Sequence, residues 1–180
     1  IQNSAGTSLF TADTTAAGKI TLLGNNSGDL NNFTSAVYSL PDERYGHTSV
    51  TANGYVYVVG GQDDTFAERD TIYYAKFNSN GSINAWNTNV ENLPAGRYRA
   101  SSIVYNGYIY VIGGFDGSAH STVYYAILNA DGSTGAWITN VNALPAERSA
   151  NSAAIINGFV YILGVSDDST IQSTVYYAKF

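Results

Sequence analysis

Residues 93–114 read LPAGRYRASSIVYNGYIYVIGG, and this stretch decides the fold because two other stretches repeat its layout. Residues 40–61 read LPDERYGHTSVTANGYVYVVGG, and residues 144–164 read LPAERSANSAAIINGFVYILG. Each copy carries Leu-Pro, an Arg three residues after the Pro, a run of small residues, an Asn-Gly pair and an apolar stretch that ends in glycine. Ordered features at a fixed spacing indicate a repeat protein, whose units bury surface mainly against their neighbours.

Each repeat contains the markers of four short antiparallel strands. Its Asn-Gly pair tolerates the positive φ of a type I′ turn and therefore joins the first two strands as a hairpin. A tyrosine pair marks the third strand, and Trp86 or Trp137 marks the fourth. The first two strands are expected at 48–51 with 55–59, 101–105 with 108–112, and 152–156 with 159–163.

With these features the chain resembles the Kelch repeats that form the blades of β-propellers. The resemblance covers residues 28–180, with blades that start near residues 40, 93 and 144. It implies an all-β fold of three four-stranded blades plus an extra outer strand. Gly164-Val165 lacks the second glycine, so the turn there is expected to differ. The features that carry the resemblance are the double glycines 60–61 and 113–114, the tyrosine pairs 73–74, 124–125 and 176–177, both tryptophans and the Arg after each Leu-Pro.

The extra outer strand is expected at residues 33–38. Gly28, Phe33 and Leu40 are spaced like the glycine, tryptophan and Leu-Pro leucine of the later repeats, so Phe33 takes the tryptophan position of an incomplete blade. The last repeat stops at Phe180, after its third strand. Closed propellers have at least about four blades, so we expect completion from outside the chain. The favoured source is strand exchange in a homodimer with six blades, and the rival is flanking sequence of a longer polypeptide.

An N-terminal segment, residues 1–27, is expected to be a separate β segment or linker. Apolar residues at 9–10 and 20–23 lie on either side of a Thr-rich stretch, a pattern that predicts two strands joined by a turn. The first 23 residues resemble the Asn- and Thr-rich β-repeats of tail-fibre-like and giant surface proteins. The segment lacks the repeat motif upstream of Ile20.

The composition argues against several classes of partner. Eight basic and fourteen acidic side chains give a net charge of −6, and no block of Lys or Arg occurs, so neither nucleic acid nor an anionic membrane is an expected ligand. The chain has no Cys, which excludes disulfides and thiol chemistry. No apolar run reaches the roughly 18 to 20 residues of a membrane span. No cofactor and no membrane insertion are expected.

The candidate binding residues lie in loops. In a four-stranded antiparallel blade, the loop into the blade and the loop between its second and third strands open on the same face, where variable loops on a regular scaffold suit recognition. Arg99, His47 and His120 break the repeat and carry most weight. The ligand-binding candidates are Tyr45, His47, Asp63, Asp64, Tyr98, Arg99, Asp116, His120, Asn151 and Asp167.

Other recurring residues have structural interpretations. Arg44, Arg97 and Arg148 occur once per repeat at one position, which favours a repeated bond, for example to loop carbonyls. The adjacent acids at 63–64 and 167–168 lack the ligand order of a calcium loop, and such pairs more often solvate a turn. No metal site is therefore expected.

Two functional classes follow from the resemblance. Copper-oxidase propellers need a Cys-linked Tyr, which this chain lacks. Sialidase-type propellers need three arginines around one carboxylate, whereas here Arg44, Arg97 and Arg148 form the repeated series and Arg99 stands apart from it. We therefore expect a non-catalytic binding or structural propeller of a larger surface or adhesion-type protein, at a cell surface or outside the cell, that recognises a protein or a glycan. The alternative is a glycan-processing enzyme of the sialidase or epimerase type.

Overall fold

The structure, a computed structural model, describes residues 10–12, 20–22, 32–167 and 169–180. Its regular elements are all β-strands. Within these ranges, no helix has the length and apolar character needed to cross a membrane. Contacts divide the chain into two compact units, Ile1–Ser35 and Ala36–Phe180.

The first unit contains a two-stranded antiparallel sheet. Strand β1 (Phe10–Ala12) pairs with β2 (Ile20–Leu22), and Phe10 lies opposite Leu22. These are the two strands predicted from the apolar groups. The predicted Thr-rich turn at residues 13–19 and the boundary near Gly28 lie outside the described residues.

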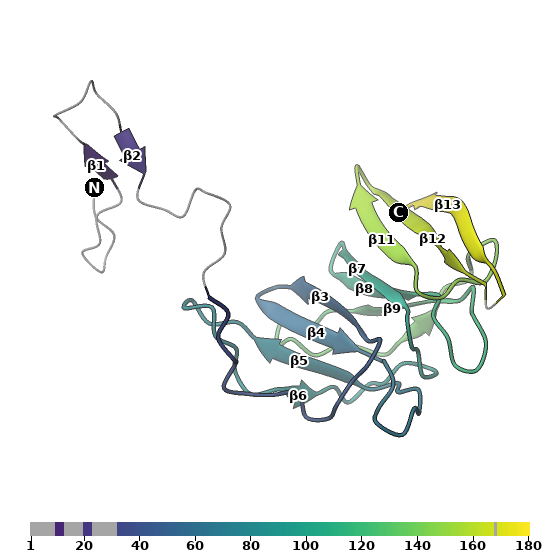
Figure 1. Cartoon of the computed structure of the whole chain (residues 1–180), viewed down its shortest axis with the longest axis horizontal. Coiled ribbons are helices and arrows are strands. Elements are labelled where there is room, and N and C mark those ends of the chain that lie inside the picture. The colour runs from purple at the N-terminus through teal and green to yellow at the C-terminus, as the bar shows by residue number, and fades with distance from the viewer. Residues whose placement is uncertain (1–9, 13–19, 23–31, 168) are drawn as a thin grey trace. The chain divides into compact units, whose positions relative to one another are not determined.

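The second unit contains three antiparallel sheets, here called blades 1, 2 and 3 in chain order, as expected for a propeller (Figure 1). Within each blade the strands lie side by side in sequence order. Blade 1 consists of β3 (Thr48–Ala52), β4 (Tyr55–Val59), β5 (Ile72–Lys76) and β6 (Asn87–Thr88). Blade 2 consists of β7 (Ser101–Tyr105), β8 (Tyr108–Ile112), β9 (Val123–Ile127) and β10 (Ile138–Thr139). Blade 3 consists of β11 (Ser152–Ile156), β12 (Phe159–Ser166) and β13 (Ile171–Lys179).

The hairpins match the sequence prediction. Asn53 and Gly54 have φ values of 52° and 80°, and the other two Asn-Gly pairs have closely similar values, as a type I′ turn requires. The third repeat, in which Val165 replaces the second glycine, also differs from the other two as expected. Strand β12 continues through Gly164 to Ser166, with a register shift between Leu163 and Val165, so the double-glycine turn is replaced by a longer strand.

The outer strand predicted at residues 33–38 is wrong for the single chain, because residues 32–40 form no strand. An outer strand needs the third strand of its own blade as a hydrogen-bonding partner. No such strand precedes Thr48 among the described parts of the second unit. Blade 3 ends at β13 with three strands, as predicted for a last repeat that stops after its third strand.

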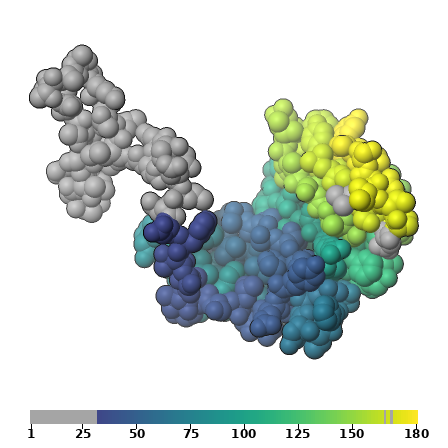
Figure 2. Space-filling model, in the orientation of Figure 1, coloured from purple at the N-terminus to yellow at the C-terminus, as the bar shows by residue number. Residues whose placement is uncertain are grey.

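The apolar core lies in the seams between blades. Tyr57, Ile72 and Ile109 are fully buried in the first seam, between blades 1 and 2, and Trp137 packs against the same cluster. The smaller second seam, between blades 2 and 3, centres on Ile103, Ile112 and Ile162. Figure 2 shows the blades following one another from blue to yellow, so each blade is buried mainly by its chain neighbours.

The double glycines form the backbone contact at each seam. Gly60 and Gly113 have φ values of 63° and 65°, which side chains rarely adopt. A Cβ added to Gly113 would lie 2.4 Å from the carbonyl oxygen of Arg148 in the next blade. The amide of Gly114 donates to the same carbonyl at 2.8 Å. Glycine is therefore needed here for both conformation and space.

The three repeated arginines hold the blades together internally. The Arg97 guanidinium donates to the hydroxyl of Tyr124 at 2.7 Å and to the Gly96 carbonyl at 2.7 Å, and it stacks on the Tyr124 ring. Arg44 and Arg148 make the same bonds and contacts in their own blades. The predicted bonds to loop carbonyls are thus present. The tyrosine partner is the first member of each pair, a role that the sequence did not indicate.

Candidate functional site

The loops predicted to share one face are joined by backbone hydrogen bonds. Tyr98, in the loop into blade 2, exchanges two bonds of 2.8 and 3.0 Å with Phe115, in the loop after β8. Tyr45 with Gln62, and Ser149 with Ser166, form the corresponding bridges in the other blades. The loops that carry the candidate residues therefore lie on one face, which we call the loop face.

Successive blades are linked at this face through one backbone position. Gly46, Arg99 and Ala150 each lie two residues after the repeated arginine, and all three have φ between 54° and 60°. The amide of Arg99 donates to the Gly46 carbonyl at 2.8 Å, and the amide of Ala150 donates to the Arg99 carbonyl at 2.7 Å. We call this chain of bonds the backbone ladder. It holds the Arg99 backbone firmly and leaves its side chain to other contacts.

Three predicted residues, Tyr45, Tyr98 and Arg99, form a cluster across blades 1 and 2. The two rings lie 5.3 Å apart between centroids, and the Arg99 guanidinium lies 4.7 Å above the Tyr98 ring. Arg99 also donates to the Tyr45 hydroxyl at 3.3 Å. A hydrogen bond from Tyr98, followed by the bond from Arg99, lowers the pKa of Tyr45 below its ordinary value. Tyr45 is 57% exposed, so the cluster offers an aromatic surface beside a cation.

A second cluster joins two more candidates, Asp116 and His120. One Asp116 oxygen accepts from the Arg97 guanidinium at 2.6 Å, and the other contacts Nε2 of His120. Asp116 follows Phe115, which pairs with Tyr98, so the two clusters belong to adjoining loops. The His120 carbonyl in turn accepts from the Arg148 amide of blade 3 at 2.9 Å.

Two candidate aspartates organise their own loops. The carboxylate of Asp63 accepts from the amides of Thr65 and Ala67 and pairs with Arg69. Asp167 caps the turn after β12 in the same manner, and the amide of Thr170, followed by the Ser169 hydroxyl, lowers its pKa to about 2. Bonds of this kind leave little of either carboxylate for a ligand.

The remaining candidates are spread out. His47 and Asp64 are exposed, and neither makes a hydrogen bond within the described part of the chain. Asn151 is buried and donates to Ser101 at 2.7 Å, while its own side-chain oxygen has no partner in the described structure. The structure thus gathers Tyr45, Tyr98, Arg99, Asp116 and His120, and it leaves the others in separate positions.

Sequence reasoning missed Phe66, at the tip of the loop between β4 and β5. This side chain is 74% exposed, and its φ is 62°, a strained conformation for a bulky residue. The loop holds it by a bond from its amide to the Asp63 carbonyl at 3.1 Å. The available signal was an aromatic residue inside a loop two residues longer than its counterpart in blade 2.

The described residues offer no clear catalytic centre. No group of three or more His, Cys, Asp or Glu side chains among them could hold a metal ion. The three repeated arginines do not converge, because each is buried against the tyrosine of its own blade.

The family profile of the KLHDC2/KLHL20/DRC7 Kelch-repeats domain matches residues 26–179. The chain belongs to the Kelch-repeat family. Its sheets are therefore Kelch blades, as the repeated glycines and tyrosine pairs predicted.

Two similar proteins extend this comparison. Human Kelch-like protein 6 is 41% identical over 68 residues, which are 38% of this chain and 10% of that protein. The solved structure of YjhT superposes with a TM-score of 0.55 at 19% identity and covers 69% of this chain and 35% of that one. The Kelch chain thus spans only a small part of either relative, and the likeness to YjhT concerns the fold.

Proposed function

We propose that this Kelch chain is a non-catalytic binding module that recognises a protein ligand through its loop face. Kelch-repeat propellers typically bind proteins. The observation that carries the proposal is the cluster of Tyr45, Tyr98 and Arg99, in which Arg99 takes a backbone position that Gly46 and Ala150 hold in the other repeats. Exposed aromatic and arginine side chains are the types enriched at the energetic centres of protein interfaces.

The charge of the cluster suggests the chemistry of the ligand. Arg99 is a cation at the rim of a chain with a net charge of −6. Its planar guanidinium is already oriented by the Tyr98 ring, and it can donate two parallel hydrogen bonds to a carboxylate. The proposed ligand is therefore a protein segment with an acidic side chain next to an apolar one that packs on Tyr45.

Cross-linking from Tyr45 tests the proposal. A photoreactive amino acid at position 45 is expected to capture a protein from extracts of the source cells, and mass spectrometry would map the acidic segment. Arg99→Ala should abolish this capture without loss of stability, because Ala150 already occupies the equivalent position with the same φ of 54°. Lys76→Ala, an exposed cation at the opposite end of the strands, is the charge-matched control.

A glycan array and a glycosidase screen on the same sample separate the remaining alternatives. Array binding that depends on Arg99 would replace the protein ligand by a glycan. Turnover that is lost on substitution of Asp63, Asp64 or Asp116 would replace the binding function by glycan processing. The predicted surface location is a further proposal, and surface labelling of the source cells would check it.

A further inference from the structure

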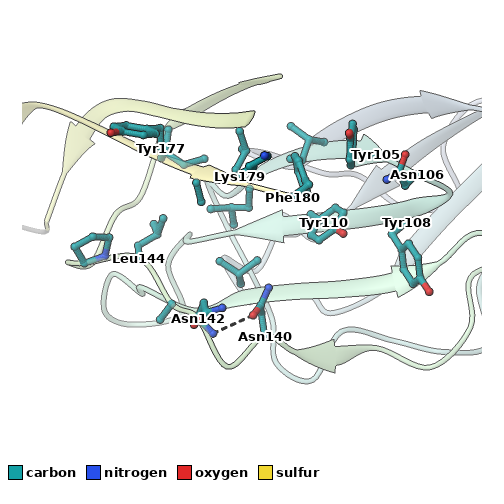
Figure 3. Close-up of a pocket in the computed structure, with 18 residues that line it drawn as sticks. Tyr105, Asn106, Tyr108, Tyr110, Asn140, Asn142, Leu144, Tyr177, Lys179 and Phe180 are labelled. Atoms are coloured by element: carbon teal, nitrogen blue, oxygen red, sulfur yellow. Dashed lines mark hydrogen bonds between the residues drawn. The ribbon is translucent and has the colours of Figure 1, made fainter. Parts of the chain in front are cut away.

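A groove of about 530 Å³ lies between blades 2 and 3. Tyr108 and Tyr110 of β8 form one wall, and Phe180, which follows β13, packs edge-on against Tyr110 from blade 3 (Figure 3). Asn140, which follows β10, lies at the edge. The groove is mainly apolar and is open along the outer edge of blade 3, where β13 has no neighbouring strand.

The equivalent space in the first seam is filled by the fourth strand of blade 2 and the turn before it. Trp137 packs there against the cluster that contains Tyr55 and Tyr57. Gly132 lies against the Tyr55 ring, so closely that an added Cβ would be 2.4 Å away. A strand with a glycine five residues before an aromatic residue therefore fits this space.

Polar bonds complete the filled seam. The Thr134 amide donates to Oδ1 of Asn89 at 2.9 Å, and Nδ2 of Asn89 donates to the Thr134 hydroxyl at 2.8 Å. Asn140 is the counterpart of Asn89 in blade 2. Its Oδ1 instead accepts from the amide of the nearby Asn142 at 2.9 Å. Asn140 is therefore placed to receive a further strand, since its side chain makes no bond to blade 3 among the described residues.

The groove residues are correspondingly more exposed than their counterparts. Tyr57 is fully buried in the first seam, whereas Tyr110 is only partly buried. The groove thus has the lining of a seam from which the fourth strand is missing.

We propose that the groove binds residues 28–35 of a second copy of this chain, with Phe33 in the position of Trp137. Gly28 lies five residues before Phe33, as Gly132 lies five residues before Trp137. The Phe33 side chain is 91% exposed, so the donor loses no contact of its own on transfer. Thr34 of the second copy would pair with Tyr177 as Ile138 pairs with Tyr125.

Once Phe33 is in place, the repeat spacing also positions the blades of the second copy. Phe33 is seven residues before Leu40, the spacing of Trp137 to Leu144, so blade 1 of the second copy docks on blade 3. Gly164 has the backbone conformation and the space that this contact needs. Its φ is 64°, close to that of Gly113 in the second seam, and the nearest neighbouring atom to a Cβ placed on Gly164 would be 3.7 Å away. The carbonyl of Ala150, which accepts no bond within the described chain, would receive the Gly46 amide. Two such exchanges close a dimer of six blades, independently of what the loop face binds.

Light scattering on the full chain tests the exchange. The expected mass is twice the 19.2 kDa of one chain at micromolar concentration. Phe33→Ala should raise the dimer dissociation constant by about 100-fold or more, the loss typical of a large buried aromatic side chain. The control is Val37→Ala, since Val37 is 87% exposed and its counterpart Val90 is 92% exposed beside a filled seam. A monomeric wild-type chain, or a dimer unaffected by Phe33→Ala, would overturn the proposal.

A labelled peptide tests the groove directly. A fluorescent peptide of residues 28–40 should bind the Phe33→Ala chain, whose groove is left open, and fluorescence anisotropy would measure the affinity. The same peptide with alanine in place of phenylalanine should bind at least about tenfold more weakly. Asn140→Ala in the receiving chain should also weaken binding. Equal binding of the two peptides would assign the groove to another occupant.

Discussion

Asn89 and Thr134 are 45 residues apart in sequence and form a reciprocal pair that is buried in the first seam. The amide side chain of Asn89 also donates to the Glu91 carbonyl. Each polar atom of the Asn89 side chain is therefore satisfied, and the pair fixes the fourth strand of blade 2 against blade 1. Stability of the seam depends on this bond as well as on the apolar core.

Asn89→Ala is expected to lower the free energy of unfolding by about 2 to 3 kcal/mol, because it leaves the buried amide and hydroxyl of Thr134 without partners. Urea denaturation followed by tryptophan fluorescence would measure the loss. The control is Asn78→Ala, which removes bonds to Ser82 and Asn84 at an exposed turn and should cost less than about 1 kcal/mol. A double-mutant cycle with Thr134→Ala should show coupling, and additive effects would contradict the reciprocal pair.

Gly113→Ala and Gly107→Ala separate backbone strain from steric contact. Both glycines have positive φ, 65° and 78°, so each substitution should cost about 1 to 2 kcal/mol for the left-handed conformation. Only at Gly113 does the new Cβ meet the Arg148 carbonyl, whereas nothing lies within 4 Å at Gly107. Denaturant melts should therefore show an additional loss of about 1 to 3 kcal/mol for Gly113→Ala. Equal losses would mean that the seam is looser than described.

Trp137→Ala should lower the free energy of unfolding by about 3 to 5 kcal/mol, since its ring packs against the apolar cluster of the first seam. The neighbouring Ile138, which is exposed, provides the control, and Ile138→Ala should cost less than about 1 kcal/mol. Chemical denaturation monitored by circular dichroism is suited to both variants. A loss below about 1 kcal/mol for a folded Trp137→Ala protein would place the ring outside the core.

Tyr57 gives the chain an expected sensitivity to alkaline pH. Burial, followed by the neighbouring Tyr55, raises the pKa of Tyr57 to about 12. Because the folded state holds the proton more tightly than the unfolded state, this contribution to stability is complete below pH about 10 and is lost as the pH rises toward 12. Tyr57→Phe should reduce that loss. At neutral pH it should cost little, since the Tyr57 hydroxyl is buried without a partner in the described structure. An unchanged alkaline profile for Tyr57→Phe would contradict the assignment.

The fold was predictable because its local signals agree. The Asn-Gly turns, the tyrosine pairs and the double glycines each require a particular backbone conformation, and all of them occur at one period. The strand at residues 33–38 was not predictable in the same way, since a strand forms only where a partner strand is present. Sequence spacing identifies the candidate position but does not supply that partner.

The candidate site was predicted less well than the fold. The rule that residues breaking the repeat carry function selected Arg99, His47 and His120, and the structure places Arg99 and His120 in clusters but leaves His47 outside them. Loop position did not separate Asp64, which makes no hydrogen bond among the described residues, from Asp63, whose oxygens are used by its own loop. Carboxylates can serve a ligand or a turn, and only three-dimensional hydrogen bonding distinguishes the two uses.

The backbone ladder has a consequence for how this surface can diversify. Gly46, Arg99 and Ala150 adopt one conformation and, wherever two blades meet, one pattern of bonds, although their side chains range from none to a full guanidinium. The backbone conformation at this position therefore does not depend on which side chain is present. A lineage could exchange the three side chains independently, and so alter ligand preference, while the joints between blades stay unchanged.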